Sequence, residues 1–269
     1  MEVNKIYNEN CLDTMARMPD GFIDLTVTSP PYDNLRAYTG EMTWNEDVWK
    51  AIIKELHRVT KVGGVVVWVV GDAAIKGSET GTSFKQALFA MKCGFNMHDT
   101  MIYQKSTPPL THNRYERNFE YMFVWSKGKP NTFNGLREPR EYTDNRKSKA
   151  FGRNKDNSFN FGYSTQNETR LKRNVWKYFA GGGANDKIAS KHPAIFPEQL
   201  AQDHILSWSN EGDLVYDPFM GSGTTAKMAL LNKRNYIGSE LSKEYCEIAE
   251  KRIVVDANEK LVKELKDAN

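Results

Sequence analysis

The sequence predicts an α/β protein built on a mostly parallel sheet with helices on both faces. Short apolar runs that resemble strands alternate with amphipathic segments that resemble helices. The run 65–70, Val-Val-Val-Trp-Val-Val, is continuously apolar, as expected of a parallel strand covered on both sides. Polar loops follow two of the expected strands, and open α/β sheets place their ligands at the carboxyl ends of strands.

The first half of the chain supplies four strands and two helices to this fold. Residues 22–28 form the first expected strand. Apolar residues at 48, 52, 53, 56 and 59 share one helical face and predict a helix over 45–61. Gly63 and Gly64 are expected to end this helix, because glycine readily adopts a left-handed conformation. After the strand 65–70 we expect a helix over 83–91 and two antiparallel strands at 100–104 and 119–125.

The second half begins with a long stretch, from 126 to 183, that shows no sustained periodicity. A loop of this length is unusual in a compact domain unless it is devoted to binding. Regular structure resumes with a helix over 197–208, a strand at 213–217, a helix over 224–233, a strand at 236–240 and a final helix from 243. We therefore expect one domain in two halves, 1–127 and 191–269, with an insertion at 128–190.

The net charge of +3 conceals a strong asymmetry. Residues 127–191 carry 15 Lys or Arg against 6 Asp or Glu, so the rest of the chain is net negative. Such a basic segment is typical of nucleic-acid binding. The alternative is an ordinary solvated loop region.

Cysteine and histidine usage exclude several other classes of protein. Cys11, Cys93 and Cys246 lie far apart in apolar contexts, which favours buried thiols in a reducing compartment. No apolar run is long enough to span a bilayer and no signal stretch is apparent, so we expect a cytoplasmic protein without membrane partners. The five histidines show no metal-ligand spacing, so we expect no catalytic metal.

A glycine-rich loop near the end of the chain indicates a nucleoside cofactor. Residues 221–226, Gly-Ser-Gly-Thr-Thr-Ala, match a dinucleotide-binding pattern, and Glu240 follows at a distance suited to a ribose diol. Asp217, just before the turn, would repel a pyrophosphate but suits the ammonium and sulfonium charges of S-adenosylmethionine. The Gly-Lys-Ser/Thr of an ATP or GTP loop is missing. The structural alternative is a glycine turn that only packs a helix on a strand.

The loop 29–32, Ser-Pro-Pro-Tyr, follows the first strand and suits chemistry on a planar amine. The lone pair of an exocyclic amine on a nucleobase is delocalised into the ring. Two acceptors, the Ser29 hydroxyl and the Pro30 carbonyl, would turn the nitrogen toward a tetrahedral geometry and stabilise its growing positive charge. Pro30 and Pro31 stiffen the loop, and Tyr32 offers a stacking face for a flipped base. Taken alone, an ordinary Pro-Pro turn explains this motif equally well.

The two motifs together resemble the β-class DNA amino-methyltransferases. The resemblance covers nearly the whole chain and lies in the catalytic motif 28–32, the cofactor motif 217–225 and their order, because most methyltransferases of this fold place the glycine motif first. It implies a Rossmann-like class I methyltransferase sheet with permuted motif order and an inserted DNA-recognition region. It also implies S-adenosyl-L-methionine as cofactor, with Ser29, Pro30, Pro31 and Tyr32 as the catalytic residues.

The resemblance assigns further residues to the cofactor. The segment 10–12 resembles the part that contacts the cofactor's adenine, and 191–197 the part that closes over its methionine. The full set is Cys11, Leu12, His192, Pro193, Asp217, Phe219, Gly221, Gly223, Thr224, Thr225 and Glu240. For Cys11, His192 and Tyr103, ordinary core or turn roles remain open.

Double-stranded DNA is the expected partner. The segment 101–105 resembles the part that flanks the flipped base, although Tyr103 and Gln104 depart from the family's pattern. The expected DNA-binding residues are Lys105, Arg114, Arg117, Arg146, Arg153, Arg170, Lys172 and Arg173. A surface ion pair is an equally good interpretation of Arg114 and Arg117.

These expectations combine into methyl transfer from S-adenosylmethionine to an exocyclic amine in duplex DNA. In the family, Ser-Pro-Pro-Tyr is more usual for cytosine N4, so we expect N4-methylcytosine, with N6-methyladenine as the alternative. An NAD-dependent oxidoreductase and a DNA-binding protein with an inactive methyltransferase fold are the competing classes. The resemblance allows a cognate restriction endonuclease as a partner, a monomer or a homodimer, and a source in a bacterium, archaeon or phage.

Overall fold

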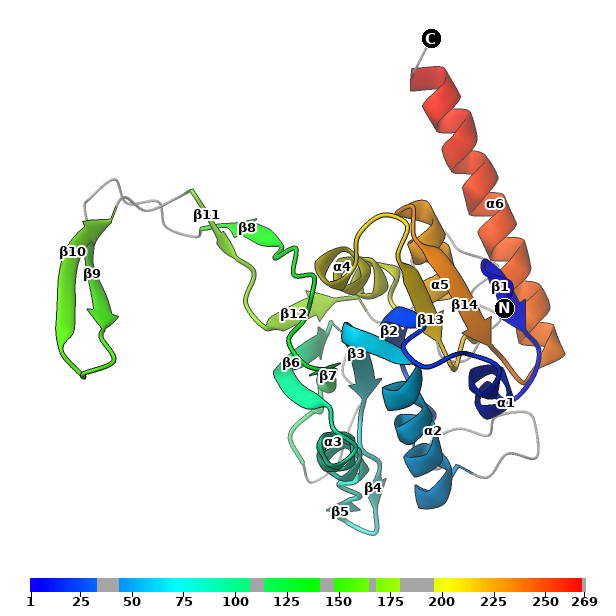
Figure 1. Cartoon of the computed structure of the whole chain (residues 1–269), viewed down its shortest axis with the longest axis horizontal. Helices are drawn as coiled ribbons and strands as arrows, with labels where there is room; N and C mark the ends of the chain where they lie inside the picture. Colours follow the sequence, from blue (N-terminus) through cyan, green and yellow to red (C-terminus); the bar gives the residue numbers. More distant parts are fainter. Residues whose placement is uncertain (33–43, 107–113, 141–147, 165–167, 180–195, 268–269) are drawn as a thin grey trace. The chain divides into compact units, whose positions relative to one another are not determined.

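The computed structural model describes residues 1–32, 44–106, 114–140, 148–164, 168–179 and 196–267. The chain divides into two compact units (Figure 1). The larger unit comprises Met1–Asn134 and Asn174–Asn269, and the smaller comprises Gly135–Arg173. The smaller unit falls inside the insertion expected at 128–190.

The larger unit is built on an eight-stranded sheet with the order β1-β14-β13-β2-β3-β7-β6-β12. In that order the strands are Lys5–Tyr7, Asn235–Ser239, Leu214–Asp217, Ile23–Thr28, Thr60–Val70, Phe119–Ser126, Asn96–Lys105 and Val175–Tyr178. Only β7 runs antiparallel to its neighbours in this sheet. The carboxyl ends of the other seven strands therefore share one edge with the start of β7. The sheet confirms the expected α/β class.

Six helices accompany this sheet in the described part of the chain. They are α1 (Cys11–Ala16), α2 (Glu46–Val59), α3 (Thr82–Lys92), α4 (Glu198–Trp208), α5 (Thr224–Leu231) and α6 (Lys243–Asp267). Helix α2 packs against both α1 and α3, and α5 packs against both α4 and α6. The helices thus form two groups, one from each half of the larger unit (Figure 1).

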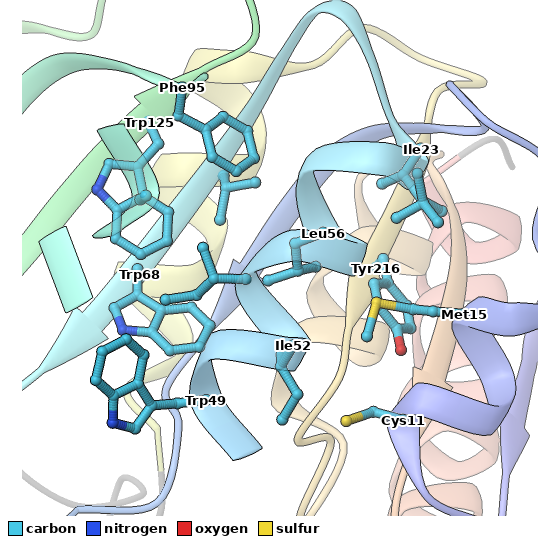
Figure 2. Packing of buried hydrophobic residues seen from close by; sticks show 14 of the residues in the cluster. Cys11, Met15, Ile23, Trp49, Ile52, Leu56, Trp68, Phe95, Trp125 and Tyr216 are labelled. Atoms are coloured by element: carbon cyan, nitrogen blue, oxygen red, sulfur yellow. The ribbon is translucent and has the colours of Figure 1, made fainter. Parts of the chain in front are cut away.

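The core covers both faces of the sheet. On β3, Val66, Trp68 and Val70 belong to a cluster with α1 and α2, which Figure 2 shows around Ile52, Leu56 and Trp125. The alternating residues Val65, Val67 and Val69 are also fully buried, and because successive strand residues point to opposite faces they lie on the other side. Helix α4 reaches that side, where His204 Nε2 lies 3.3 Å from Met122 Sδ of β7. The continuous apolar run predicted this burial.

The junction between α2 and β3 corrects the expected helix end. Helix α2 begins where predicted, with the Asn45 side chain accepting from the Val48 amide at 3.1 Å. It ends at Val59, because Thr60 leaves it in an extended conformation and starts β3 directly. Gly63 and Gly64 do not end the helix. Gly63 has a φ of +84° inside β3, where the register between β2 and β3 shifts.

The irregular stretch expected from 126 to 183 contains short strands. In the smaller unit β8 (Arg137–Pro139) pairs with β11 (Thr169–Leu171), and β9 (Ser148–Arg153) pairs with β10 (Phe159–Ser164). Strand β12 joins the main sheet beside β6. Each strand has only three to six residues, too few for a periodic signal to stand out.

Two small features complete the description. Strands β4 (Ala74–Ile75) and β5 (Ser78–Glu79) form a short hairpin before α3. No helix in the described residues is both long enough and apolar enough to cross a membrane.

Candidate active site

The catalytic and cofactor motifs meet at the centre of the sheet edge. The chain passes from β2 to β3 on one side and from β13 to β14 on the other, so the strand order reverses between β2 and β13. Ligands of open α/β sheets bind at such a switch point. Thr28 ends β2 and Asp217 ends β13, and the Thr28 hydroxyl donates to Asp217 Oδ1 at 2.6 Å. The two motifs, 189 residues apart, are joined by this contact.

The Asp217 carboxyl is buried and partly satisfied by its own loop. The same Oδ1 also accepts from the Phe219 amide at 2.9 Å, and the Thr225 hydroxyl is a further hydrogen-bond partner. Burial raises the pKa of this carboxyl to about 6, more than these donors lower it. The nearby Glu240 carboxylate raises the pKa of Asp217 further. The site is therefore electrostatically unfavourable to anions.

Glu240 holds the glycine loop from the end of β14. Its carboxylate accepts from the Gly221 amide at 2.8 Å and from the Ser242 amide at 2.9 Å. Burial raises the pKa of Glu240, while these amides lower it. In the part of the chain that the structure describes, neither Asp217 nor Glu240 has an ion-pair partner. A buried and a partly buried carboxylate without a cation suit a ligand that brings positive charge and hydroxyl donors.

The glycines of the loop serve the backbone and the packing. Gly221 and Gly223 have φ values of +52° and +83°. A Cβ on Gly223 would lie 2.6 Å from the Cβ of Ala249 in α6. The expected structural alternative, a turn that packs a helix, therefore describes part of the role of Gly223. Thr224 and Thr225 follow at the start of α5, both buried.

Other expected cofactor residues lie around this loop or outside the described residues. Cys11 is 3% exposed at the start of α1, and burial raises the pKa of its thiol to about 12. Leu12 is partly buried against the same core. The ring of Phe219 meets Trp44 edge-on, with centroids 5.5 Å apart. His192 and Pro193 lie outside the described residues.

The catalytic loop carries a chain of hydrogen bonds. Ser29 Oγ lies 3.2 Å from Tyr32 Oη, and the Tyr32 hydroxyl donates to Glu120 Oε2 at 2.7 Å. Glu120 is also ion-paired with Lys105. Pro30 is buried and Pro31 partly buried, so the loop is packed on the sheet edge. The Ser29 hydroxyl and the Tyr32 ring thus lie in the loop after β2, and Thr28, which precedes this loop, contacts Asp217 before the glycine turn.

The expected DNA-binding residues fall into three groups. Lys105 pairs with Glu120 beside the Ser-Pro-Pro-Tyr loop. Arg114 and Arg117 both pair with Glu79 of the β4–β5 hairpin, in agreement with the surface ion pair given as the alternative interpretation. Arg153 and Arg173 are exposed, Lys172 is partly exposed, and Arg170 pairs with Glu138 at 2.7 Å. Arg146 lies outside the described residues.

Sequence reasoning missed two residues of this region. Glu120 had no local signal, because it reaches Tyr32 only through the antiparallel pairing of β7. Arg252, 1% exposed in α6, donates to Ser222 Oγ at 3.0 Å and to Glu198 at 2.9 Å, which supports the glycine loop from behind. Among the described residues no group of three His, Cys, Asp or Glu is arranged to hold a metal ion.

Comparisons with known proteins place this site in a family. A family model described as DNA methylase, of the N6 and N4 type, matches residues 23–251. The chain is 55% identical over 242 residues to the orphan methyltransferase M.BamHII of Bacillus amyloliquefaciens, which covers 87% of this chain and 89% of that protein. The chain belongs to the DNA methylase family. It is an S-adenosylmethionine-dependent DNA amino-methyltransferase, and the expected resemblance is confirmed.

More distant relatives agree with the fold. The type II methyltransferase M.BglII of Bacillus subtilis is 26% identical over 253 residues, covering 92% of this chain and 68% of that protein. The structure of the PvuII DNA methyltransferase, titled cytosine-N4-specific, matches with a TM-score of 0.69 at 19% identity, covering 94% and 91% of the two chains. The M1.HpyAVI–SAM complex matches with a TM-score of 0.59 at 22% identity, covering 92% and 98%. The class I methyltransferase sheet expected for this DNA methylase is confirmed.

Proposed function

We propose that this DNA methylase transfers a methyl group to the exocyclic N4 of a cytosine flipped out of duplex DNA. The observation that carries the proposal is the position of Ser29. Its hydroxyl stands at the sheet edge beside the Asp217 turn, in hydrogen-bond range of Tyr32. The choice between cytosine and adenine depends on the hydrogen bonds that this hydroxyl can donate and accept.

Ser29 and Pro30 prepare the amine for attack. Ser29 Oγ and the Pro30 carbonyl each accept one N–H of the amine, which draws the nitrogen out of conjugation with the ring. The nitrogen lone pair then forms the new N–C bond, while positive charge grows on nitrogen. Fixed oxygen dipoles stabilise that charge without reorganising. When bound, S-adenosylmethionine supplies an electrophilic methyl group whose C–S bond electrons return to sulfur.

A hydroxyl at this position favours cytosine over adenine. A serine hydroxyl both accepts from the amine and donates to the neighbouring N3 of cytosine, whereas a carboxylate only accepts. The Ser29–Tyr32 contact of 3.2 Å is long for two oxygens, so the serine hydrogen is free to turn toward a bound base.

Asp217, Glu240 and the glycine loop form the proposed cofactor site. Asp217 and Glu240 offer the two negative charges, and Glu240 at the end of β14 is placed to accept from ribose hydroxyls. Gly221 and Gly223 keep the loop backbone clear of side chains. Phe219, Thr224, Thr225, Leu12, His192 and Pro193 complete the proposed set, whereas Cys11 supports it from the core.

The smaller unit is the proposed DNA-recognition region. The register pairs Lys149 with Tyr163, Phe151 with Phe161 and Arg153 with Phe159 in the β9–β10 ribbon. A two-stranded ribbon fits the major groove, and a segment whose sequence combines cations with aromatic residues suits phosphates and bases. A partner endonuclease and the oligomeric state stay predictions.

Product analysis tests the base assignment. Duplex DNA methylated with labelled cofactor is digested to nucleosides, which mass spectrometry identifies. We expect N4-methylcytosine, and a methyladenine peak without it would assign the enzyme to adenine N6. Ser29→Ala should remove most turnover while preserving cofactor affinity, because the interaction is needed chiefly in the transition state. Turnover that survives this substitution would remove Ser29 from the mechanism.

A further inference from the structure

Glu120 sits at the catalytic edge because β7 is antiparallel. Its neighbours in the sheet end at this edge, whereas β7 begins there with Phe119 and Glu120. The Glu120 side chain is 12% exposed. One of its oxygens accepts from the Tyr32 hydroxyl at 2.7 Å, and the other pairs with the Lys105 ammonium. Gly71, directly after β3, lies beside both side chains: a Cβ there would be 3.4 Å from Glu120 Cγ and 3.7 Å from Tyr32 Cε2.

These contacts fix the direction of the hydrogen bonds. An ionised carboxylate has no hydrogen to donate, so Tyr32 must give its single hydroxyl hydrogen to Glu120. Tyr32 Oη is then unable to donate to Ser29. The two lone pairs of Ser29 Oγ therefore stay available, whether the serine hydrogen points at Tyr32 or at a bound base.

We propose that Glu120 is a positioning residue that acts through Tyr32 to keep Ser29 Oγ an acceptor for the target amine. The inference rests on the proposed role of Ser29. Lys105 pairs with the other carboxylate oxygen of Glu120, so this lysine acts within the same network. A tyrosine hydrogen directed at Ser29 would compete with the amine N–H for a lone pair, which slows methyl transfer without loosening the DNA.

The test uses Glu120→Gln in two backgrounds. With its amide oxygen toward Lys105, the glutamine presents N–H to Tyr32 Oη, which turns the tyrosine hydrogen back toward Ser29. We expect the single-turnover rate, at saturating cofactor and DNA, to fall roughly tenfold or more. In a Tyr32→Phe background no hydroxyl remains to reverse, so adding Glu120→Gln should change the rate less than twofold.

The same variants separate this role from a purely structural one. Loss of the Lys105 ion pair alone would lower the rate by the same factor in both backgrounds, and that result would overturn the proposal, as would an unchanged rate in Glu120→Gln. Affinities for S-adenosylmethionine and DNA should stay at the parental values. Glu55→Gln, which removes a carboxylate paired with Arg58 on α2, is the matched control and should leave the rate unchanged.

Two further measurements keep the result interpretable. If Glu120→Gln does not fold, Tyr32→Phe alone still tests the idea, because it cannot block Ser29 and should retain at least tenfold more activity than Ser29→Ala. Equal losses in these two variants would contradict it. If Ser29→Ala is as active as the parent, the proposed function fails. If Ser29→Ala is inactive but Glu120→Gln lowers the rate by the same factor in both backgrounds, only the proposed role of Glu120 fails.

Discussion

Thr28 and Asp217 share a hydrogen bond of 2.6 Å across the strand-order reversal of the sheet. The accepting oxygen of Asp217 also receives the Phe219 amide, so one buried carboxylate oxygen links the strand that precedes Ser29 to the turn that precedes the glycine loop. A change at Thr28 should therefore disturb both motifs.

Thr28→Val removes this donor while keeping the side-chain shape. We expect the free energy of unfolding to fall by about 1–3 kcal/mol, the cost of leaving a buried acceptor short of a donor. Thr26→Val is the matched control, because the fully buried Thr26 hydroxyl lacks a partner within the described chain. Denaturant titration should show Thr26→Val at or above parental stability. Similar losses in both variants would assign the effect to strand packing and not to the bond.

Cofactor affinity should depend on pH through Asp217. Burial raises the pKa of Asp217 to about 6, so the carboxyl is increasingly protonated below that pH. A cationic ligand prefers the ionised form, so its affinity should fall by up to about tenfold per pH unit as the pH drops below 6. Calorimetric titrations at several pH values, from roughly one unit below to two units above the pKa of Asp217, would measure the affinity in both protonation states.

Two variants identify the titrating group. Asp217→Asn should bind more weakly and lose most of the pH dependence, whereas Glu240→Gln should bind more weakly but retain it. The effect of pH on the free energy of unfolding has the opposite sign to its effect on cofactor affinity. The folded protein holds the Asp217 proton more tightly than the unfolded chain, so this group lowers the unfolding free energy as the pH rises from 3.8 to about 6. A pH-independent affinity in the parent would place the cationic ligand away from Asp217.

Gly223→Ala tests the packing of the glycine loop on α6. The new Cβ would lie 2.6 Å from the Cβ of Ala249, at a φ of +83°. We expect a loss of stability of about 2–4 kcal/mol, from the left-handed conformation and the overlap together. Gly212 has a φ of +87°, and a Cβ built on it would meet no heavy atom within 4 Å. Gly212→Ala should therefore show only the conformational cost of about 1 kcal/mol. Equal losses would mean that α6 moves aside without cost.

The salt dependence of DNA binding tests the smaller unit. Each phosphate contact contributes about −0.9 to the slope of log affinity against log salt. Substituting Arg153, Lys172 and Arg173 with Gln should make this slope shallower and leave cofactor affinity unchanged. If the slope stays at its parental value in the triple variant, these residues do not contact the phosphates.

Local sequence patterns predicted the parts of the fold that local forces determine. The helix expected over 45–61 was correct in kind and in its start, because five apolar residues share one face, although it ends at Val59; the strand 65–70 was correct because it is apolar throughout. The glycine pair at 63–64 misled, since a left-handed glycine occurs in strand bulges as well as at helix ends. Strand β12 was missed because it has only four residues and gives no periodic signal. Its partner in the sheet, β6, ends 70 residues before β12 begins.

The candidate site shows the same contrast between local signals, which could be recognised in the sequence, and long-range contacts, which could not. Ser29 and Asp217 could be found because strand-then-loop signals are contiguous in sequence. Glu120 could not, because its contact with Tyr32 depends on the pairing of β7 with β3, which no short pattern records. The roles of Arg114 and Arg117 depended on whether an acidic partner was near, and Glu79 became their neighbour only through the hairpin fold.

The strand order also has a consequence for synthesis on the ribosome. Strand β2 lies between β3, which follows it closely, and β13, whose final residue comes 189 positions after Thr28. At bacterial or similar elongation rates the growing chain spends on the order of 10–40 s with one side of this central strand unpaired. During that interval β2 presents an apolar open edge of the kind that promotes aggregation. We therefore expect the nascent chain to need protection from aggregation until β13 has emerged.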